Sequence, residues 1–266
     1  AIIEKRINIH KEGSYFALKN VYNKWYSDQS IFPYAYFHKI DGIYYDNKFR
    51  IINDTHRFIK ETEFNFPVIL KASKDTFGGV GVRLIKDKSE LYSVLEQFDY
   101  FVCQEKIQQN EFLAKINNSS LNTVRVCLLR TSVGKFEVLN NSIRFGVNGG
   151  LDNETGGGLV CNIDEDGFLN EYAVNKFANK YLKHPNSNIE FKSLQLPFYS
   201  ELLLQSKKIA DELLLSNLVS LDMSLDIENI WRCIEINISG QTIRFAQYAG
   251  RPFFGEYTDE IINKCC

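Results

Sequence analysis

The chain has 266 residues, of which 44% are hydrophobic and 24% are charged, and its 31 basic and 33 acidic side chains leave a formal net charge of −2. This composition is typical of a globular protein with a sizeable core, and it excludes a disordered chain, a collagen-like fibre and a coiled coil. The near-neutral charge predicts no general attraction to nucleic acid or to an anionic membrane. No apolar run is long enough to span a bilayer, and the first residues do not have the pattern of a signal peptide.

The six cysteines have no spacing typical of a metal site. Most of them lie singly in apolar stretches, and two end the chain: Cys103, Cys127, Cys161, Cys233, Cys265 and Cys266. We therefore expect buried, reduced thiols and a cytoplasmic protein. Two disulfides in a secreted protein are the alternative.

Residues 1–60 are expected to form a reduced N-terminal segment with a helix and a hairpin. Aromatic and apolar side chains recur at three- and four-residue steps between Lys11 and Tyr26, which is a helical pattern. Asp41-Gly42 and Asp46-Asn47 punctuate short β-prone pieces and indicate a hairpin of Ile43 to Tyr45 with Phe49 to Ile52.

Residues 61–115 have the pattern of a small α+β unit. Strands are predicted at Val68 to Leu70, Val82 to Ile85 and Tyr100 to Cys103. Before the last strand, Ser89 to Phe98 alternates as an amphipathic helix, with Ser89 as its expected N-cap. A glycine-containing loop separates the first two strands.

Residues 116–266 are expected to form a second α+β unit that is richer in strands. Its boundary lies in the polar stretch near residue 116. The predicted strands are Thr123 to Thr131, Lys135 to Ile143, Leu159 to Ile163, Leu218 to Leu225 and Ile230 to Ile236. The predicted helices are Tyr199 to Leu215 and Thr258 to Lys264, and Asn148 to Gly158 is a glycine-dense loop.

Two neighbouring strands near the end of the chain carry a cluster of hard oxygen ligands. Glu235 and Asn237 are two positions apart, so both side chains leave the same face of their strand, and a turn at Glu228-Asn229 would bring Asp222 beside them. Two carboxylates and an amide oxygen suit Mg²⁺. The alternative is a pair of edge strands whose polar side chains face water.

Two further segments are candidates for nucleotide contacts. An apolar strand delivers Lys71 to a loop containing Gly78, Gly79 and Gly81, where backbone N–H groups could approach phosphate oxygens. A second strand runs into Gln104-Glu105-Lys106-Ile107, followed by Glu111, where backbone groups could pair with an adenine edge and a carboxylate with a ribose. A lysine before a turn and a strand ending in a polar loop are the simpler interpretations.

In this order, the three segments resemble the ATP-grasp superfamily over about residues 66 to 240. The resemblance implies two α+β lobes that sandwich ATP, with Mg²⁺ bound beside it. It implies a phosphate lysine at Lys71, a flexible glycine loop at Thr76 to Val82, an adenine hinge at Gln104 to Ile107 and a ribose-binding acid at Glu111. It also implies metal ligands at Asp222, Glu235 and Asn237, while Lys39, Lys48 and Arg50 are candidates for a second phosphate cation.

Two stretches resemble a narrower branch, the sugar-transfer-associated ATP-grasp proteins, which are similar to teichuronopeptide-type ligases. They are "SSLNTVRVCLLRT" from Ser119 and "NSIRFGVNGGLDNETGGGLVCNIDEDG" from Asn141. This resemblance implies a carbohydrate-linked substrate. Arg125, Arg144 and Arg244 are the catalytic candidates, because a guanidinium grips a phosphate or an acyl-phosphate with two donors. Ion pairs with acidic residues are the alternative.

We therefore expect an ATP-dependent carboxylate–amine ligase that forms an acyl-phosphate and then an amide. The expected partners are a small or saccharide-linked carboxylate and an amine, with surface-polysaccharide biosynthesis as the setting. A kinase that uses Asp222 or Asp152 as its base is the first alternative. A nucleotide-binding module without catalysis is the second.

Overall fold

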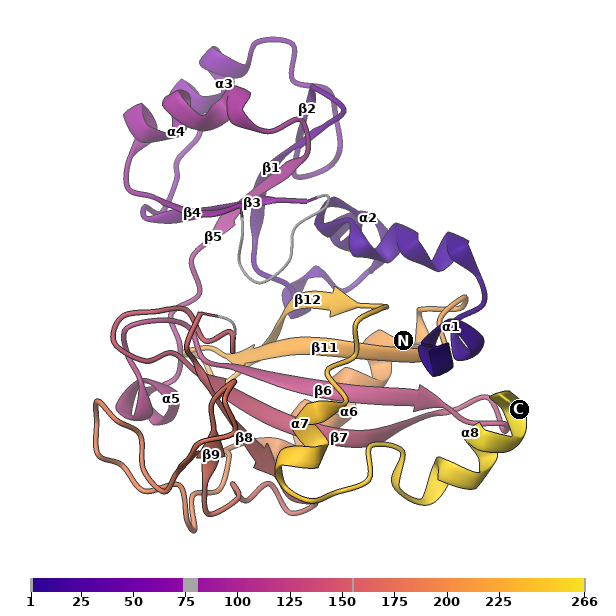
Figure 1. Ribbon diagram of the computed structural model, residues 1–266. Helices are drawn as coiled ribbons and strands as arrows, with labels where there is room; N and C mark the ends of the chain where they lie inside the picture. Colours follow the sequence, from indigo (N-terminus) through magenta and orange to yellow (C-terminus); the bar gives the residue numbers. More distant parts are fainter. Residues whose placement is uncertain (1, 74–80, 155, 266) are drawn as a thin grey trace. The chain divides into compact units, whose positions relative to one another are not determined.

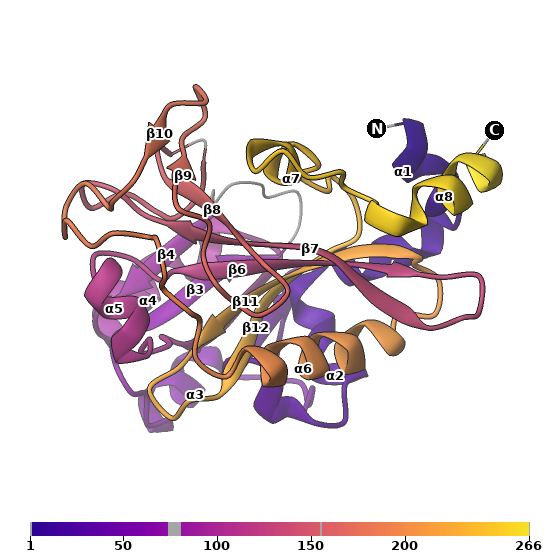
Figure 2. The same cartoon turned by 90° about the horizontal axis from the view of Figure 1, so that it is seen from below.

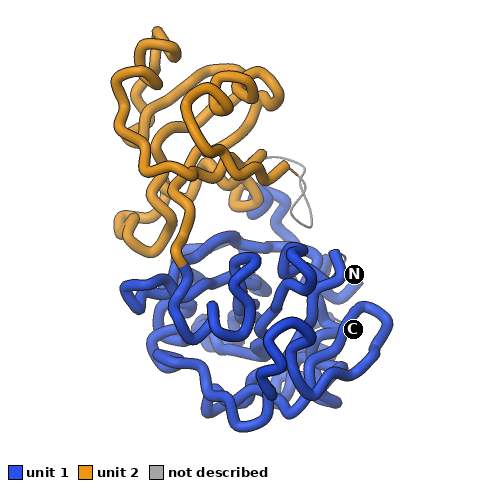
Figure 3. The backbone as a smooth tube through the Cα atoms, turned by 90° about the vertical axis from the view of Figure 1, so that its left-hand side faces the viewer, with its two compact units in different colours: residues 1–14, 109–266 blue, residues 15–108 orange. Residues whose placement is uncertain are grey.

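The computed structural model describes residues 2–73, 81–154 and 156–265, and it is a mixed α+β structure built on two antiparallel sheets (Figure 1). Contacts divide the chain into two compact units (Figure 3): unit 2 is residues 15–108, and unit 1 combines residues 1–14 with 109–266. These limits describe compactness, and the sequence-based division at residues 60 and 115 into functional lobes stays a prediction.

Unit 2 contains a five-stranded antiparallel sheet in the order β2-β1-β5-β3-β4. Its strands are β1 Ala35–Ile40, β2 Ile43–Asp46, β3 Val68–Ala72, β4 Val82–Ile85 and β5 Phe101–Glu105. Two helices, α3 (Thr55–Glu61) and α4 (Lys88–Val94), cover one face of this sheet (Figure 1). The core beneath them is built from buried side chains that include Phe37, Ile59, Leu70, Leu91 and Phe101.

The single helix predicted between Lys11 and Tyr26 is wrong. The segment forms short turns instead: η1 Lys11–Ala17, η2 Lys19–Val21 and α2 Tyr22–Trp25, followed by η3 Gln29–Ile31. Leu18 has an extended backbone, with ψ at 112°, and this interrupts the helix. The aromatic spacing reflects local ring packing, since Phe16 and Trp25 lie edge to face with centroids 5.1 Å apart.

The predicted hairpin and the predicted cap of α4 also need correction. β2 pairs with β1 across Asp41-Gly42. The predicted pairing of β2 with Phe49 to Ile52 is present in part, as one bridge from Ile51 to Tyr45 flanked by backbone bonds from the Asp46 N–H to the Arg50 carbonyl and from the Ile52 N–H to the Tyr44 carbonyl. The Asp46 carboxylate accepts N–H bonds from the two backbone groups at positions 48 and 50, which folds this stretch into a turn. The cap of α4 is Asp87, which accepts from the Glu90 N–H, and Ser89 lies within the helix.

Unit 1 contains a seven-stranded antiparallel sheet in the order β10-β9-β8-β7-β6-β11-β12. Its strands are β6 Thr123–Arg130, β7 Phe136–Phe145, β8 Leu159–Ile163, β9 Ala173–Val174, β10 Lys180–Tyr181, β11 Leu218–Leu225 and β12 Trp231–Asn237. The helix α6 (Tyr199–Asp211) covers one face and α7 (Arg244–Tyr248) lies on the other (Figure 2). The five long strands predicted here are confirmed.

The remaining helical elements include several that the sequence analysis did not identify. The elements that were not predicted are α1 Ile2–Ile7, α5 Glu111–Ile116 and η5 Gly255–Tyr257. The predicted closing helix is α8 Thr258–Cys265, and η4 Leu95–Gln97 continues the predicted helix of α4. The first and last helices, α1 and α8, lie side by side in unit 1 (Figure 2). Just after α1, the Asn8 amide oxygen accepts from the Asn217 and Leu218 N–H groups at 2.7 and 2.9 Å, and its nitrogen donates to the Leu218 carbonyl at 2.6 Å.

The described cysteines are buried free thiols, as predicted: Cys103, Cys127, Cys161, Cys233 and Cys265. Burial raises the pKa of the Cys127 and Cys161 thiols to about 12, so both stay protonated at neutral pH. In the part of the chain that the structure describes, no helix has both the length and the apolar character needed to cross a membrane.

Candidate active site

The predicted site residues of unit 1 lie on one face of the seven-stranded sheet. Asp222 in β11 pairs directly with Glu235 in β12 and with Arg125 in β6. Directly paired residues of an antiparallel ladder project from the same face, so these three side chains are neighbours in one row. Asn237 pairs with Ser220 and lies on the same face in the next row.

Two arginines converge on the Asp222 carboxylate. Arg125 is bidentate, with Nε 2.8 Å from Oδ1 and Nη2 2.8 Å from Oδ2. Arg144, from the neighbouring strand β7, places Nη2 3.0 Å from the same Oδ2. Three charge-assisted contacts therefore engage both carboxylate oxygens.

This cluster is almost completely buried, and the charges compensate one another. Asp222 is 3% exposed and Arg125 is 8% exposed. Burial by itself raises the pKa of the Asp222 carboxyl, but the guanidinium groups of Arg125 and Arg144 outweigh it and hold that pKa well below its usual range. Asp222 is therefore ionised at neutral pH.

Arg144 links this cluster to the glycine-dense loop. Its Nε donates to the Thr123 hydroxyl at 3.0 Å and lies 3.7 Å from Asp152 Oδ2. The Thr123 hydroxyl in turn donates to the Asp152 carboxylate. Burial raises the pKa of the Asp152 carboxyl, and Arg144 only partly opposes that effect. Asp152 thus favours its neutral form more than Asp222 does.

Arg244 takes part in a separate ion pair. Its Nε donates to Glu154 Oε2 at 2.9 Å, and the Tyr248 hydroxyl donates to the other oxygen of the same carboxylate. Glu154 is 5% exposed, whereas half of the Arg244 side chain is exposed. The pair therefore fixes the first turn of α7 to the glycine-dense loop, and it leaves part of the guanidinium accessible.

The residues predicted to bind Mg²⁺ have suitable donor chemistry, but Asp222 already has partners. Asp222, Glu235 and Asn237 share one face, and the buried Ser220 Oγ, Asn237 Nδ2 and Gln241 Oε1 atoms have no hydrogen-bond partner among the described residues. Unsatisfied buried polar atoms mark a place where water or a ligand can bind. Of the four lone-pair positions of the Asp222 carboxylate, three accept arginine N–H groups.

In unit 2, the predicted phosphate and adenine residues occupy neighbouring strands. Lys71 in β3 pairs with Val102 in β5, and Ile69 pairs with Gln104, so Lys71 and Gln104 project from the same face of the sheet. Glu105 projects from the opposite face, which carries the core under α3 and α4. Gly81 precedes β4 with a φ of 79°, and Gly78 and Gly79 lie outside the described residues.

The end of the predicted hinge leaves the sheet, and Glu111 belongs to the other unit. The ladder of β3 with β5 ends at Glu105, so Lys106 and Ile107 follow as an extended connection. Glu111 is the exposed first residue of α5 and lines a hollow of about 430 Å³ in unit 1, formed with Asn110, Phe112, Lys115, Ile227 and Asn229.

Two of the candidates for a second phosphate cation are engaged elsewhere. The Lys39 ammonium donates to the Leu95 carbonyl at 3.1 Å and to Glu96 Oε2 at 2.9 Å, on the helix-covered face of its sheet. Arg50 pairs with Asp46 at 2.6 Å. Lys48 is exposed.

Sequence reasoning missed several polar groups that orient the site. Thr123 positions Arg144, Thr242 accepts from Arg125 Nη1 at 3.2 Å, and Glu154 holds Arg244. These residues lie in loops or at strand ends, where no periodic pattern distinguishes them. The ion pairs named as the alternative for the arginines are present for all three.

Comparison with known proteins assigns this chain to a family. A profile of sugar-transfer associated ATP-grasp proteins matches residues 73–257. The chain is a member of the sugar-transfer associated ATP-grasp family, which confirms the resemblance found in the sequence. No curated protein sequence matches it significantly.

Solved structures support the same fold. An ADP complex of N5-carboxyaminoimidazole ribonucleotide synthetase has a TM-score of 0.51 at 13% identity, and the match covers 87% of this chain and 48% of that chain. The enzyme of the same name from Thermotoga maritima also has a TM-score of 0.51, at 14% identity, over 98% of this chain and 55% of that one. Biotin carboxylase from Campylobacter jejuni has a TM-score of 0.50 at 12% identity, over 88% and 42%. The chain thus spans about half the length of these structures.

The buried carboxylate predicts a large stability effect. Asp222→Asn should lower the free energy of unfolding by about 3 kcal/mol, because it leaves two buried guanidinium groups without a counter-charge. Urea denaturation at neutral pH measures this effect, with the exposed Asp211→Asn at the end of α6 as the control. An Asp222→Asn variant as stable as the control would contradict the buried ion-pair assignment.

The same contact predicts a pH dependence. The pKa of Asp222 is lower in the folded protein than in the unfolded chain. Its contribution to the free energy of unfolding is therefore complete above the pKa of an unfolded aspartate, about 3.9, and is lost as the pH falls towards the native pKa. The stability difference between wild type and Asp222→Asn should therefore shrink below about pH 4. A difference that grows on acidification would contradict this sign.

Proposed function

We propose that the protein is an ATP-dependent carboxylate–amine ligase. The observation that carries the proposal is the pair of buried arginines on the site face of unit 1, in a chain that belongs to an ATP-grasp family. The γ-phosphate of ATP would pass to a substrate carboxylate, giving ADP and an acyl-phosphate. An amine would then displace phosphate and form an amide.

Each unit would contribute its own groups to this chemistry. In unit 2, Lys71 and the glycine loop would bind the polyphosphate, and the segment from Gln104 to Ile107 would bind adenine through its backbone. In unit 1, Glu111 would contact the ribose. Arg125 and Arg144 would neutralise the transferring phosphoryl group, which needs positioning and charge compensation more than a protein nucleophile. Arg244, half exposed beside Glu154, would contact the acceptor or its phosphate.

Asp222, Glu235 and Asn237 would hold Mg²⁺, which supplies charge compensation for the phosphates when it is bound. Because Asp222 is already held by two arginines, we propose that the metal ion either shares this carboxylate with them or replaces one of them. A polyphosphate that draws Arg125 and Arg144 towards itself would free a carboxylate oxygen. Metal and nucleotide would then bind cooperatively.

The acceptor is proposed to be a saccharide-linked carboxylate in surface-polysaccharide biosynthesis, on the basis of the family description. The decisive experiment measures ADP and phosphate release with a panel of uronic acids crossed with amino acids. Release that requires both an acid and an amine supports a ligase. Phosphate retained on a single acceptor would support a kinase instead.

One observation favours the kinase as a second candidate. Asp152 is a buried carboxyl beside Arg144, and burial raises its pKa. In its ionised form, such a group would accept the proton that a hydroxyl acceptor loses as it attacks the γ-phosphate. In the ligase, the same carboxyl would accept a proton from the attacking amine.

Arg144 should contribute to the rate beyond its structural contacts. Arg144→Ala should lower kcat about a hundredfold and raise the KM for ATP less, because the contact strengthens as charge develops in the transition state. Arg144→Lys keeps the charge but loses the two-pronged donor, so it should recover only part of the rate. Kinetics and thermal stability are measured on the same samples. A stability loss with unchanged kcat would remove Arg144 from the active site.

Glu235→Gln should abolish turnover while the protein remains folded. Removing one carboxylate from the proposed metal site weakens metal binding without opening a cavity. Electron paramagnetic resonance of Mn²⁺ with a non-hydrolysable ATP analogue gives a readout that is independent of turnover. The matched control is Glu228→Gln, which changes an exposed carboxylate of the same hairpin. Wild-type Mn²⁺ binding and activity in the Glu235 variant would contradict the proposed metal site.

A further inference from the structure

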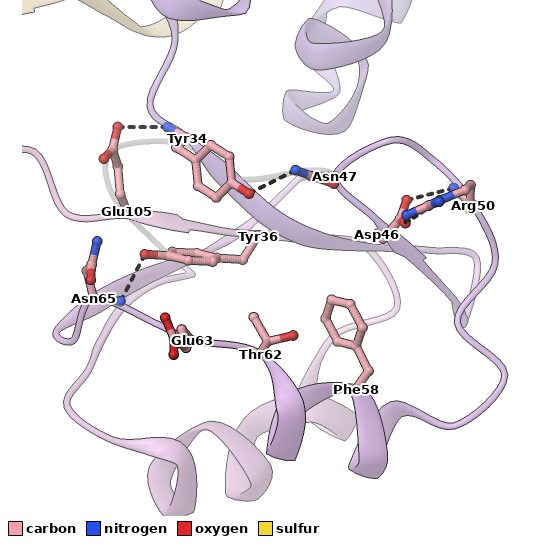
Figure 4. A pocket seen from close by; sticks show the side chains of 10 residues that line it. All are labelled: Tyr34, Tyr36, Asp46, Asn47, Arg50, Phe58, Thr62, Glu63, Asn65 and Glu105. Carbon is pink, nitrogen blue, oxygen red and sulfur yellow. Dashed lines mark hydrogen bonds and ion pairs between the residues drawn. The ribbon is translucent and has the colours of Figure 1, made fainter.

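A second hollow lies entirely within unit 2, and Figure 4 shows the side chains that line it. It lies on the face of the sheet opposite Lys71. It encloses about 420 Å³, a size in the range of small-molecule sites. The lining comes from the start of β1, the turn after β2, the end of α3 with the loop that follows it, and the end of β5: Tyr34, Tyr36, Asp46, Asn47, Arg50, Phe58, Thr62, Glu63, Asn65 and Glu105.

The tyrosines of this hollow are held in place by hydrogen bonds. Their rings lie edge to face with centroids 5.1 Å apart. The Tyr34 hydroxyl accepts from Asn47 Nδ2 at 2.8 Å, and the Tyr36 hydroxyl accepts from the Asn65 N–H at 3.0 Å (Figure 4). Tyr34 nevertheless stays 50% exposed. A half-exposed aromatic ring in a fixed orientation is a preformed binding platform.

The turn after β2 is fixed in the same way. The Asp46 carboxylate accepts from two backbone N–H groups of this turn, and it also accepts from Arg50 Nε at 2.7 Å. These contacts hold Phe49 at a φ of 60° and place Asn47 against Tyr34. They also neutralise Arg50, so its charge is already compensated within the hollow.

Two carboxylates of the hollow remain without a counter-ion. Glu105 Oε1 accepts from the Tyr34 N–H at 2.8 Å, and no cation pairs with Glu105 among the described residues. Within the same described part of the chain, the Glu63 carboxylate has neither an ion pair nor a hydrogen bond. The hollow therefore carries an excess of two negative charges.

This charge pattern selects the class of ligand. Phosphates and carboxylates are repelled, so the hollow is not a second nucleotide site. No three His, Cys, Asp or Glu side chains of the described residues are grouped to hold a metal ion, either in this hollow or at the proposed Mg²⁺ site of unit 1, whose third ligand would be the Asn237 amide. A protonated amine is attracted by both carboxylates and by the π-faces of the tyrosines.

The remaining groups favour an amine carried on a hydroxylated ring. The Tyr34 and Tyr36 hydroxyls accept protein hydrogen bonds and keep their protons for donation. The Thr62 hydroxyl and the Asn65 side-chain amide also line the hollow. A pyranose has an apolar C–H face that packs on an aromatic ring and a rim of hydroxyl groups that pair with such donors and acceptors.

We propose that this hollow binds an amino sugar, with its ammonium group at Glu63 and Glu105 and its ring against Tyr34. The proposal goes beyond the ligase function, because the hollow lies on the opposite sheet face from Lys71 and requires neither ATP nor metal. It gives unit 2 a saccharide-anchoring role.

Isothermal titration calorimetry and saturation-transfer NMR, both without ATP, test the proposal. D-glucosamine should bind with a dissociation constant on the order of 1 mM. N-acetyl-D-glucosamine and D-glucose, which lack the ammonium group, should bind at least about threefold to fivefold more weakly. L-lysinamide, which has amines but no ring, should bind more weakly than glucosamine.

Substitutions of the lining residues test whether glucosamine binds in this hollow. Tyr34→Leu should weaken glucosamine binding about tenfold, and Glu63→Gln should weaken it about threefold to fivefold. The controls are Tyr15→Leu, since Tyr15 is 48% exposed in the same unit, and Glu61→Gln, which changes an exposed carboxylate outside the hollow; both should bind as wild type.

Three outcomes would overturn the proposal: no binding of glucosamine, equal binding of its N-acetylated form or of lysinamide, or unchanged affinity in the Tyr34 and Glu63 variants. None of these outcomes depends on turnover. The ligase proposal is tested independently, by the release of ADP and phosphate.

Discussion

The carboxylate of Asp222 holds three N–H groups from two neighbouring strands, and the electrostatics of the site face follow from this contact. The two guanidinium groups face the Asp222 carboxylate, with Asp152 beside Arg144 and Glu235 directly paired with Asp222 on the next strand. Burial raises the pKa of the Asp152 carboxyl, and Arg144 partly opposes that shift. These charged groups are held at fixed positions in a region of low dielectric, where each contact is stronger than in water.

The same sheet face has an apolar end and a charged end. At one end, Cys127 and Leu218 join an apolar core with α7 and α8 that includes Phe253 and Ile261. One row further along the strands, Arg125 and Asp222 begin the charged cluster. The apolar end anchors the strands, so packing outside the charged row helps to set the register that aligns it. A rigid support of this kind keeps buried charges at fixed distances.

The sequence predicted the strands of this sheet well because buried strands are continuous apolar runs bounded by turn residues. The common face of Asp222 and Glu235 followed from the side-chain alternation and the turn. The partner of Asp222 could not be predicted, since Arg125 is 97 positions away and their pairing depends on the register of β6 with β11. The prediction of a helix between Lys11 and Tyr26 was wrong because aromatic residues at three- and four-residue steps also fit packed 3₁₀ turns. The metal, nucleotide and catalytic roles of the named residues remain predictions.

The bonds of Asn8 to β11 also affect how the chain is assembled. They join residues 210 positions apart, while all of unit 2 is formed by the contiguous residues 15–108. During synthesis, unit 2 can therefore fold as soon as its own residues are available, whereas Asn8 can bond to β11 only after that strand has been made. In the sequence, unit 2 is an insertion between the two segments of unit 1. A chain that has just completed residue 108 would therefore hold a folded insert, while Asn8 still lacks its partners on β11.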